Sequence, residues 1–118
     1  MTLYIPGQIR SKKNSKRLVR VHGRTIPISS RAYMEWETGV RTFCAGLVPT
    51  SAPVSVQAVV HYKGQRPDLS GAMESIGDAL EGVLWENDKQ IESWDGSRLV
   101  YNKTWQGIII TIREYDQV

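Results

Sequence analysis

Acidic side chains are concentrated in one segment, residues 68–95, which holds eight Asp or Glu residues and a single base, Lys89. Within it, Glu74 and Asp78 are four residues apart, so on a helix they lie one turn from each other on one face. Two carboxylates at that spacing repel, which costs a helix roughly a few tenths of a kcal/mol. Hard oxygen ligands of this kind suit Mg²⁺ or Mn²⁺, which activate water and stabilise the leaving oxygen in phosphodiester hydrolysis.

Two more aspartates flank this pair. Asp68 stands at an expected turn-to-helix junction, and Asp88 follows an expected helix end and precedes a strand. A fold that packs this strand against the start of the helix would bring Asp88 to Asp68. The alternative is that these acids are only the solvated face of an amphipathic helix. The spacing alone is compatible with both interpretations.

The N-terminal part of the chain is basic, because residues 1–34 hold eight Lys or Arg and no acid. A basic surface suits phosphate backbones, whereas an acidic segment beside it would be repelled by phosphate unless cations neutralised it. Basic residues together with metal-ligating acids therefore suggest a nuclease, although a solvated basic loop has the same composition. The residues predicted to contact DNA are Lys12, Lys13, Asn14, Lys16, Arg17 and Arg66.

The length of 118 residues argues for one domain, and 41% hydrophobic residues are enough for a packed core. No apolar run approaches the roughly 20 residues of a membrane span, and the N-terminus does not resemble a signal peptide, so we expect no membrane partner. Cys44 is the single cysteine, which excludes an intramolecular disulfide and favours a reducing, cytoplasmic setting. We expect Cys44 to be a core or helix residue.

Two helices are expected to position the candidate residues. Ser29 and Ser30 can cap the first, whose apolar positions recur at steps of three and four. In the second helix the apolar positions share one face, and Ser70, Glu74, Asp78 and Glu81 lie on the other side. The apolar positions are Tyr33, Trp36, Val40, Phe43 and Leu47 in the first helix, and Leu69, Met73, Ile76, Leu80 and Val83 in the second.

The remaining segments predict strands. Residues 3–5, 54–60, 99–101 and 105–115 read as strands, with 108–112 buried, and residues 18–21 and 25–28 form a hairpin around His22 and Gly23. Residues 10–17 are expected to form a loop. The resulting fold class is α+β: a single small domain over residues 1–118, with a mixed β-sheet and two main helices.

Three segments together resemble the RusA family of Holliday-junction resolvases. Residues 6–17 are similar to its N-terminal P-G-x-P-x-S-K-K-N-S segment. Residues 66–80 resemble the D-x-D-N-x-x-K-x-x-x-D-x-L motif, and residues 82–91 resemble G-x-x-x-x-D-D-x-Q-[IV]. The resemblance implies a RusA-like α/β fold, a homodimer and Mg²⁺- or Mn²⁺-dependent paired nicking of four-way DNA junctions, in the cytoplasm of a bacterial or phage-infected cell.

Carried over residue by residue, the resemblance makes Asp68 the first catalytic aspartate, Asp78 the helix aspartate and Asp88 the last one. Ser70 stands where the family has its second aspartate, Gly71 replaces the asparagine, and Glu74 replaces the lysine. Because Glu74 lies one turn beyond Ser70, its longer side chain would compensate for the lost carboxylate. The expected metal ligands are Asp68, Glu74 and Asp88, with Asp78 as a further ligand or supporting carboxylate and Ser70 in a supporting role.

Three alternatives to junction resolution follow from these substitutions and from the composition. The first is a branched-DNA-binding module of the same fold that has lost catalysis. The second is a nuclease that acts on another DNA or RNA structure. The third is a small interaction protein whose basic arm binds an acidic partner. Nucleic-acid binding and cleavage assays separate the three.

Overall fold

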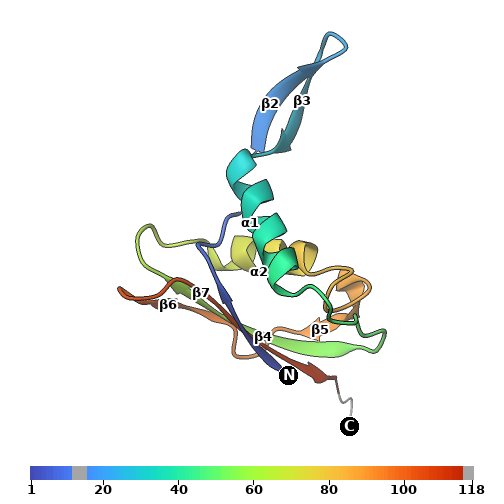
Figure 1. Cartoon of the computed structure of the whole chain (residues 1–118), viewed down its shortest axis with the longest axis vertical. Coiled ribbons are helices and arrows are strands. Elements are labelled where there is room, and N and C mark those ends of the chain that lie inside the picture. The colour runs from blue at the N-terminus through green and yellow to red at the C-terminus, as the bar shows by residue number, and fades with distance from the viewer. Residues whose placement is uncertain (12–15, 116–118) are drawn as a thin grey trace.

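The computed structural model describes residues 1–11 and 16–115. A mixed five-stranded sheet forms the base of the molecule, and both helices lie over one of its faces (Figure 1). The confirmed fold class is therefore α+β with two main helices. None of the helices in these residues has the length and hydropathy to cross a membrane. The elements in chain order are β1 (Thr2–Pro6), β2 (Lys16–Val21), β3 (Arg24–Ser29), α1 (Arg31–Phe43), β4 (Val54–Tyr62), α2 (Leu69–Ala79), the 3-10 helix η1 (Asp88–Gln90), β5 (Ile91–Ser93), β6 (Arg98–Tyr101) and β7 (Gly107–Glu114).

The sheet is mixed because β4 pairs with strands in both directions. It runs antiparallel to β7, which pairs antiparallel with β1, and parallel to both β5 and β6. Alternate residues of β4 point into the core: Val54, Val56, Ala58 and Val60 are at most 1% exposed. The predicted alternation of residues 54–60 and the buried strand at 108–112 are both confirmed.

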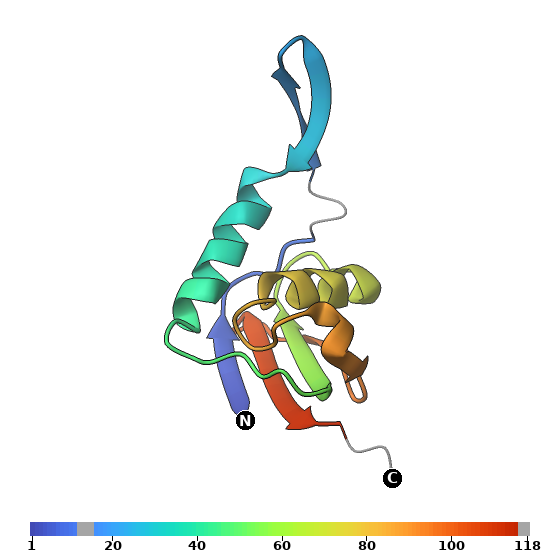
Figure 2. The ribbon, with the colours of Figure 1, turned by 90° about the vertical axis from the view of Figure 1, so that its right-hand side faces the viewer.

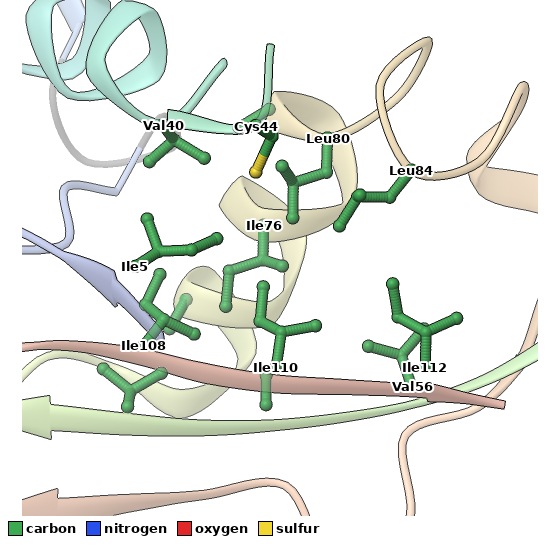
Figure 3. Packing of buried hydrophobic residues seen from close by; sticks show 14 of the residues in the cluster. Ile5, Val40, Cys44, Val56, Ile76, Leu80, Leu84, Ile108, Ile110 and Ile112 are labelled. Carbon is green, nitrogen blue, oxygen red and sulfur yellow. The ribbon is translucent and has the colours of Figure 1, made fainter. Parts of the chain in front are cut away.

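The core lies between this sheet and the two helices (Figure 3). Val40 of α1, Cys44 at the C-cap of that helix and Ile76 of α2 approach it above Ile108 and Ile110 of β7. Cys44 is 2% exposed and burial raises the pKa of its thiol, which confirms that it is a core residue. Apolar burial of this kind contributes about 25 cal/mol per Å² of surface removed from water.

α1 begins as predicted but ends earlier than its apolar pattern indicated. The hydroxyl of Ser30 accepts a hydrogen bond of 3.2 Å from the Tyr33 amide and caps the helix. The helix ends at Phe43, so Phe43 and Leu47 are exposed and Cys44 occupies the inward position. The prediction that the apolar face continues to Leu47 is therefore wrong, because the chain turns away from the helix before that residue.

α2 buries most of the face that hydrophobicity predicted, since Ile76 and Leu80 are at most 1% exposed and Met73 and Val83 pack against the core, but small residues add to that face. Ala72, Ser75 and Ile76 are at most 2% exposed, whereas Leu69 is 41% exposed and Met73 is half-buried. The small side chains let the helix approach the sheet closely, and close packing outweighs the larger apolar area of Leu69. Leu69 and Met73 are consequently left to line a surface cavity.

β2 and β3 form a separate two-stranded antiparallel sheet. It projects from the start of α1, away from the main sheet (Figures 1 and 2). We call this element, residues 16–29 with the turn at its tip, the ribbon. His22 and Gly23 form the turn with φ values of 50° and 78°, as a tight hairpin requires. The predicted hairpin is thus confirmed, but β2 already begins at Lys16, within the segment expected to be a loop.

Candidate functional site

Asp68 is fixed against the first turn of α2, whose N-cap it forms. Its Oδ2 accepts a hydrogen bond of 3.1 Å from the Gly71 amide and another of 3.0 Å from the Ser70 hydroxyl. Ser70 stands where the RusA motif has an aspartate. It still contributes to this region, because its hydroxyl donates a hydrogen bond to Asp68. Side-chain capping of this kind satisfies an amide that the helix itself leaves unpaired.

The chain folds back on the other end of α2. Gly82 has a φ of 79°, a conformation that favours glycine, and its amide donates a hydrogen bond to the Trp85 carbonyl. Trp85 is fully buried, and its indole Nε1 donates a 3.2 Å hydrogen bond to the Gly77 carbonyl of the last helical turn. The turn is thereby anchored to the helix that it follows.

Arg41 of α1 holds the same end of α2 from another side. Its Nη1 donates hydrogen bonds of 2.9 Å to the Ala79 carbonyl and 3.0 Å to the Glu81 carbonyl. A cation at the carboxyl end of a helix also interacts favourably with the helix dipole. Arg41 thus fixes the backbone on which the Glu81 side chain is carried.

A capping box positions Asp88 as the first residue of η1. Asn87 caps this short helix, and in return Oε1 of Gln90 accepts a 2.8 Å hydrogen bond from the Asn87 amide. The Nε2 of Gln90 also donates to the carbonyls of Thr50, at 2.8 Å, and Ala52, at 2.9 Å. Asp88 is therefore held on a rigid turn even though its side chain is exposed.

These contacts bring three carboxylates together, from Asp78, Glu81 and Asp88, with one oxygen of each within 4.8 Å of the others. We call them the acidic cluster. The Asp88 amide donates a 3.4 Å hydrogen bond to Oε1 of Glu81. Among the described residues, neither Glu81 nor Asp88 is ion-paired with Lys or Arg. Because like charges about 4 Å apart repel by about 1 kcal/mol even in water, a bound cation would relieve this arrangement.

A cavity of about 520 Å³ along the exposed face of α2 contains part of this cluster. We call this cavity the acidic groove. Its apolar side is formed by residues of α2 and of the segment after η1, and its polar side by carboxylates and one hydroxyl. The lining residues are Leu69, Ser70, Met73, Glu74, Gly77, Asp78, Asp88, Ile91 and Trp94.

Four of the five residues proposed for the site lie in this groove, namely Ser70, Glu74, Asp78 and Asp88. Asp68 does not, because it stands at the opposite end of α2, about 15 Å from Asp78 along the helix axis. The expectation that Asp88 lies near the start of the helix is therefore wrong, because Asp88 lies beside Asp78 and Glu81. The chain folds back directly after α2, so the strand that follows Asp88 packs near Gly77 rather than near Asp68.

Asp68 instead lines a second cavity, of about 330 Å³, with basic neighbours. Arg10 and Arg66 line the same cavity, and Arg66 is exposed. Of the other residues predicted to contact DNA, Lys12, Lys13 and Asn14 lie outside the described residues, and Lys16 and Arg17 open β2. Arg66 is thus the predicted contact whose surroundings the structure describes.

The acidic cluster contains one residue that the sequence interpretation did not select as a ligand. Glu81 falls on the polar side of the second helix in sequence, but it lies beyond the end of α2, in the turn before Gly82. Its neighbour Gly82 was the available signal, because a glycine just after a helix end often marks a left-handed residue that turns the chain back.

The family model described as Endodeoxyribonuclease RusA matches residues 6–113. The chain belongs to the RusA family. The match extends from the end of β1 to the end of β7 and includes every residue of both cavities, so the RusA resemblance of the three sequence segments is confirmed. No curated protein matches the chain. As a member of a family of endodeoxyribonucleases, this RusA-type chain carries its acidic residues in the part that defines the family.

Proposed function

We propose that the protein is a metal-dependent endodeoxyribonuclease that resolves four-way DNA junctions by paired nicks in DNA recombination and repair. The observation that carries the proposal is the acidic cluster, which lies within a chain that matches the RusA family from residue 6 to residue 113. Three carboxylates that approach one another on a surface repel a phosphate backbone. A nuclease tolerates them there when a cation neutralises the charge.

The chemistry of the cluster fits Mg²⁺ or Mn²⁺, because all three side chains offer hard oxygen ligands. Asp78, Glu81 and Asp88 would hold the ion. When bound, such an ion supplies activation of water and stabilisation of the leaving oxygen. Glu74, one helical turn before Asp78 in the acidic groove, adds a further carboxylate within the same cavity.

Asp68 has a separate role in the proposal. It organises the start of α2 through Ser70 and Gly71, and it lies between the acidic groove and the cavity lined by Arg10 and Arg66. The arginines would bind a backbone phosphate, while Asp68, with Glu74, remains a proposed catalytic residue. A homodimer would present two such sites, as symmetric cleavage of two strands requires, in the cytoplasm of a bacterial or phage-infected cell.

One observation favours a second candidate, a branched-DNA-binding module without catalysis. Oδ2 of Asp68 is occupied by two hydrogen bonds within its own helix cap, one of them from the serine that stands in place of the second family aspartate. A site that needs Asp68 and Ser70 as ligands would therefore be weakened. A site built on the acidic cluster would not be.

A synthetic four-way junction tests the proposal. The wild type is incubated with the junction with Mg²⁺, with Mn²⁺ and with chelator, beside Asp88→Asn and the matched control Glu114→Gln, which replaces an exposed carboxylate at the end of β7. We expect symmetric nicks that need the metal, loss of cleavage but retained binding in Asp88→Asn, and wild-type cleavage in Glu114→Gln. Junction binding without cleavage in either metal would support the non-catalytic module instead.

A further inference from the structure

The ribbon is not used by the acidic groove. β2 and β3 pair with each other, and in the described part of the chain neither pairs with a strand of the main sheet. An isolated two-stranded hairpin is only marginally stable in water. Figures 1 and 2 show that this one projects beyond α1 as an arm. Such an element is expected to gain stability from a binding partner.

Charge indicates the kind of partner. Residues 16–29 contain four Lys or Arg and no acid. In the distal half, Arg20 and Arg24 are exposed, and neither is ion-paired with an acidic residue of the described chain. A surface with this charge is complementary to a phosphate backbone. It would repel the same ribbon of a second copy.

Shape and exposed side chains agree with a nucleic acid. The six residues of β2 span about 20 Å, and the major groove of B-DNA, about 12 Å wide, admits a two-stranded ribbon. Leu18 is 74% exposed and Val21 is 40% exposed. Aliphatic side chains beside arginines can contact thymine methyl groups or wedge between base steps.

We propose that the ribbon is a duplex-binding arm, in which Arg20 and Arg24 contact the phosphates of one arm of the junction while Leu18, on the same face as Arg20, contacts the groove. The two strands place the arginines on opposite faces, since Arg20 pairs with Thr25 and Arg24 with Val21. This inference rests on the proposed function, because it assumes a DNA substrate. It adds a contact surface remote from the acidic groove.

Fluorescence anisotropy with a labelled four-way junction tests the arm. The wild type, the double variant Arg20→Gln/Arg24→Gln and the control Arg113→Gln are titrated in chelator between about 50 and 200 mM salt. Arg113 is an exposed arginine in β7, a strand of the main sheet, and Figure 1 shows that the ribbon projects away from this sheet. Thermal unfolding checks that all three proteins are folded.

We expect the double variant to bind about tenfold more weakly, with the slope of log affinity against log salt reduced by about two, because each duplex phosphate contact contributes about 0.9. The control should match the wild type. A double variant that also matches the wild type would overturn the arm and leave the proposed function intact. A wild type that binds no junction at low salt would overturn both.

Sedimentation of the same proteins and of Leu18→Ser without DNA tests the competing occupant, a second copy of the chain. A duplex-binding arm predicts an unchanged mass for every variant. A fall in mass for Leu18→Ser or for the double variant would overturn the proposal and identify the ribbon as a contact between subunits.

Discussion

The indole Nε1 of Trp85 lies 3.2 Å from the carbonyl oxygen of Gly77, and this hydrogen bond joins the turn after α2 to the last turn of the helix. It is buried, so its removal leaves a carbonyl without a partner. Asp78 follows Gly77, and Asp88 follows Trp85 by three residues. The Trp85 contact therefore supports the geometry of the acidic cluster, together with the hydrogen bonds of Arg41 and Gln90.

Trp85→Phe should destabilise the fold by about 1–3 kcal/mol, because the buried Gly77 carbonyl loses its donor and the smaller ring leaves a void. The measurement is urea unfolding. Manganese affinity should fall as well, since the cluster loses its support. Tyr101→Phe, at an exposed position of β6, is a suitable control. Equal losses of stability and of manganese affinity in both variants would contradict the role of Trp85.

Glu81→Gln should raise the stability of the ion-free protein slightly, since it removes one of three mutually repelling charges while the amide oxygen can still accept from Asp88. Manganese should then stabilise the variant less than the wild type, for which a concentration of 100 times Kd would give about 2.7 kcal/mol. Thermal unfolding with and without the ion measures both effects. Glu114→Gln should behave as the wild type. If manganese stabilises Glu81→Gln as much as it stabilises the wild type, Glu81 is not a ligand.

Gln90→Ala should cost about 1–3 kcal/mol, because it removes the capping-box acceptor, leaves the Ala52 carbonyl without the Gln90 donor and leaves the Thr50 carbonyl with the Glu86 amide alone. Cleavage should decrease more than junction binding, since Asp88 is the residue released. Lys89→Ala is the matched neighbour, because Lys89 enters the cap through its backbone amide alone. Similar unfolding curves for the two variants would refute the importance of the cap.

Gly71→Ala and Gly39→Ala should have opposite effects on stability. Alanine in a helix usually gains about 0.5–1 kcal/mol over glycine, and a Cβ at Gly39 of α1 would meet nothing within 4 Å. At Gly71 the Cβ would lie 3.1 Å from the Ser11 hydroxyl and 3.3 Å from Oδ2 of Asp68. The gain should therefore vanish or reverse there. Urea unfolding of both variants measures these changes in stability. A Gly71→Ala variant that is more stable than the wild type would show that the Asp68 cap can move to admit the new methyl group.

Cys44 should react slowly with a thiol reagent in the folded protein. Burial raises the pKa of its thiol, so at a given pH less of the reactive thiolate is present than in the unfolded chain, and the side chain is only 2% exposed. Labelling should be more than about tenfold faster in denaturant, where the usual pKa near 8.5 returns. Equal rates in the native and denatured protein would place Cys44 outside the core.

Local patterns predicted the fold well. Alternation in residues 54–60 and 108–112 identified the central strands, and Ser30 identified the start of α1, because each signal involves neighbouring residues. The inward face of α2 was predicted in part, because Ile76 and Leu80 are buried as expected but Leu69 is exposed. The decisive property was the small size of Ala72 and Ser75, which matters only when the sheet lies opposite.

The candidate site was predicted less completely. Ser70, Glu74 and Asp78 were correctly placed on one helix face because helical periodicity applies to them. The meeting of Asp78 with Asp88 and Glu81 depends on a turn that is closed by long-range contacts, including the hydrogen bonds from Gln90 to the loop before β4. The number of residues between Asp78 and Asp88 does not show whether the chain between them folds back on the helix. Asp88 was therefore expected near the wrong end of the helix.

The hydrogen bonds from Arg41 to the end of α2 make α1 a spacer of fixed length. The ribbon enters this helix at Ser30, and the acidic cluster is held near its other end. Its 13 residues extend about 20 Å, the rise of about six base pairs of duplex DNA. If the ribbon binds a duplex, α1 would hold the cleavage site at a fixed distance from that contact. The protein would then select the position of its cut by this distance as well as by the shape of the branch.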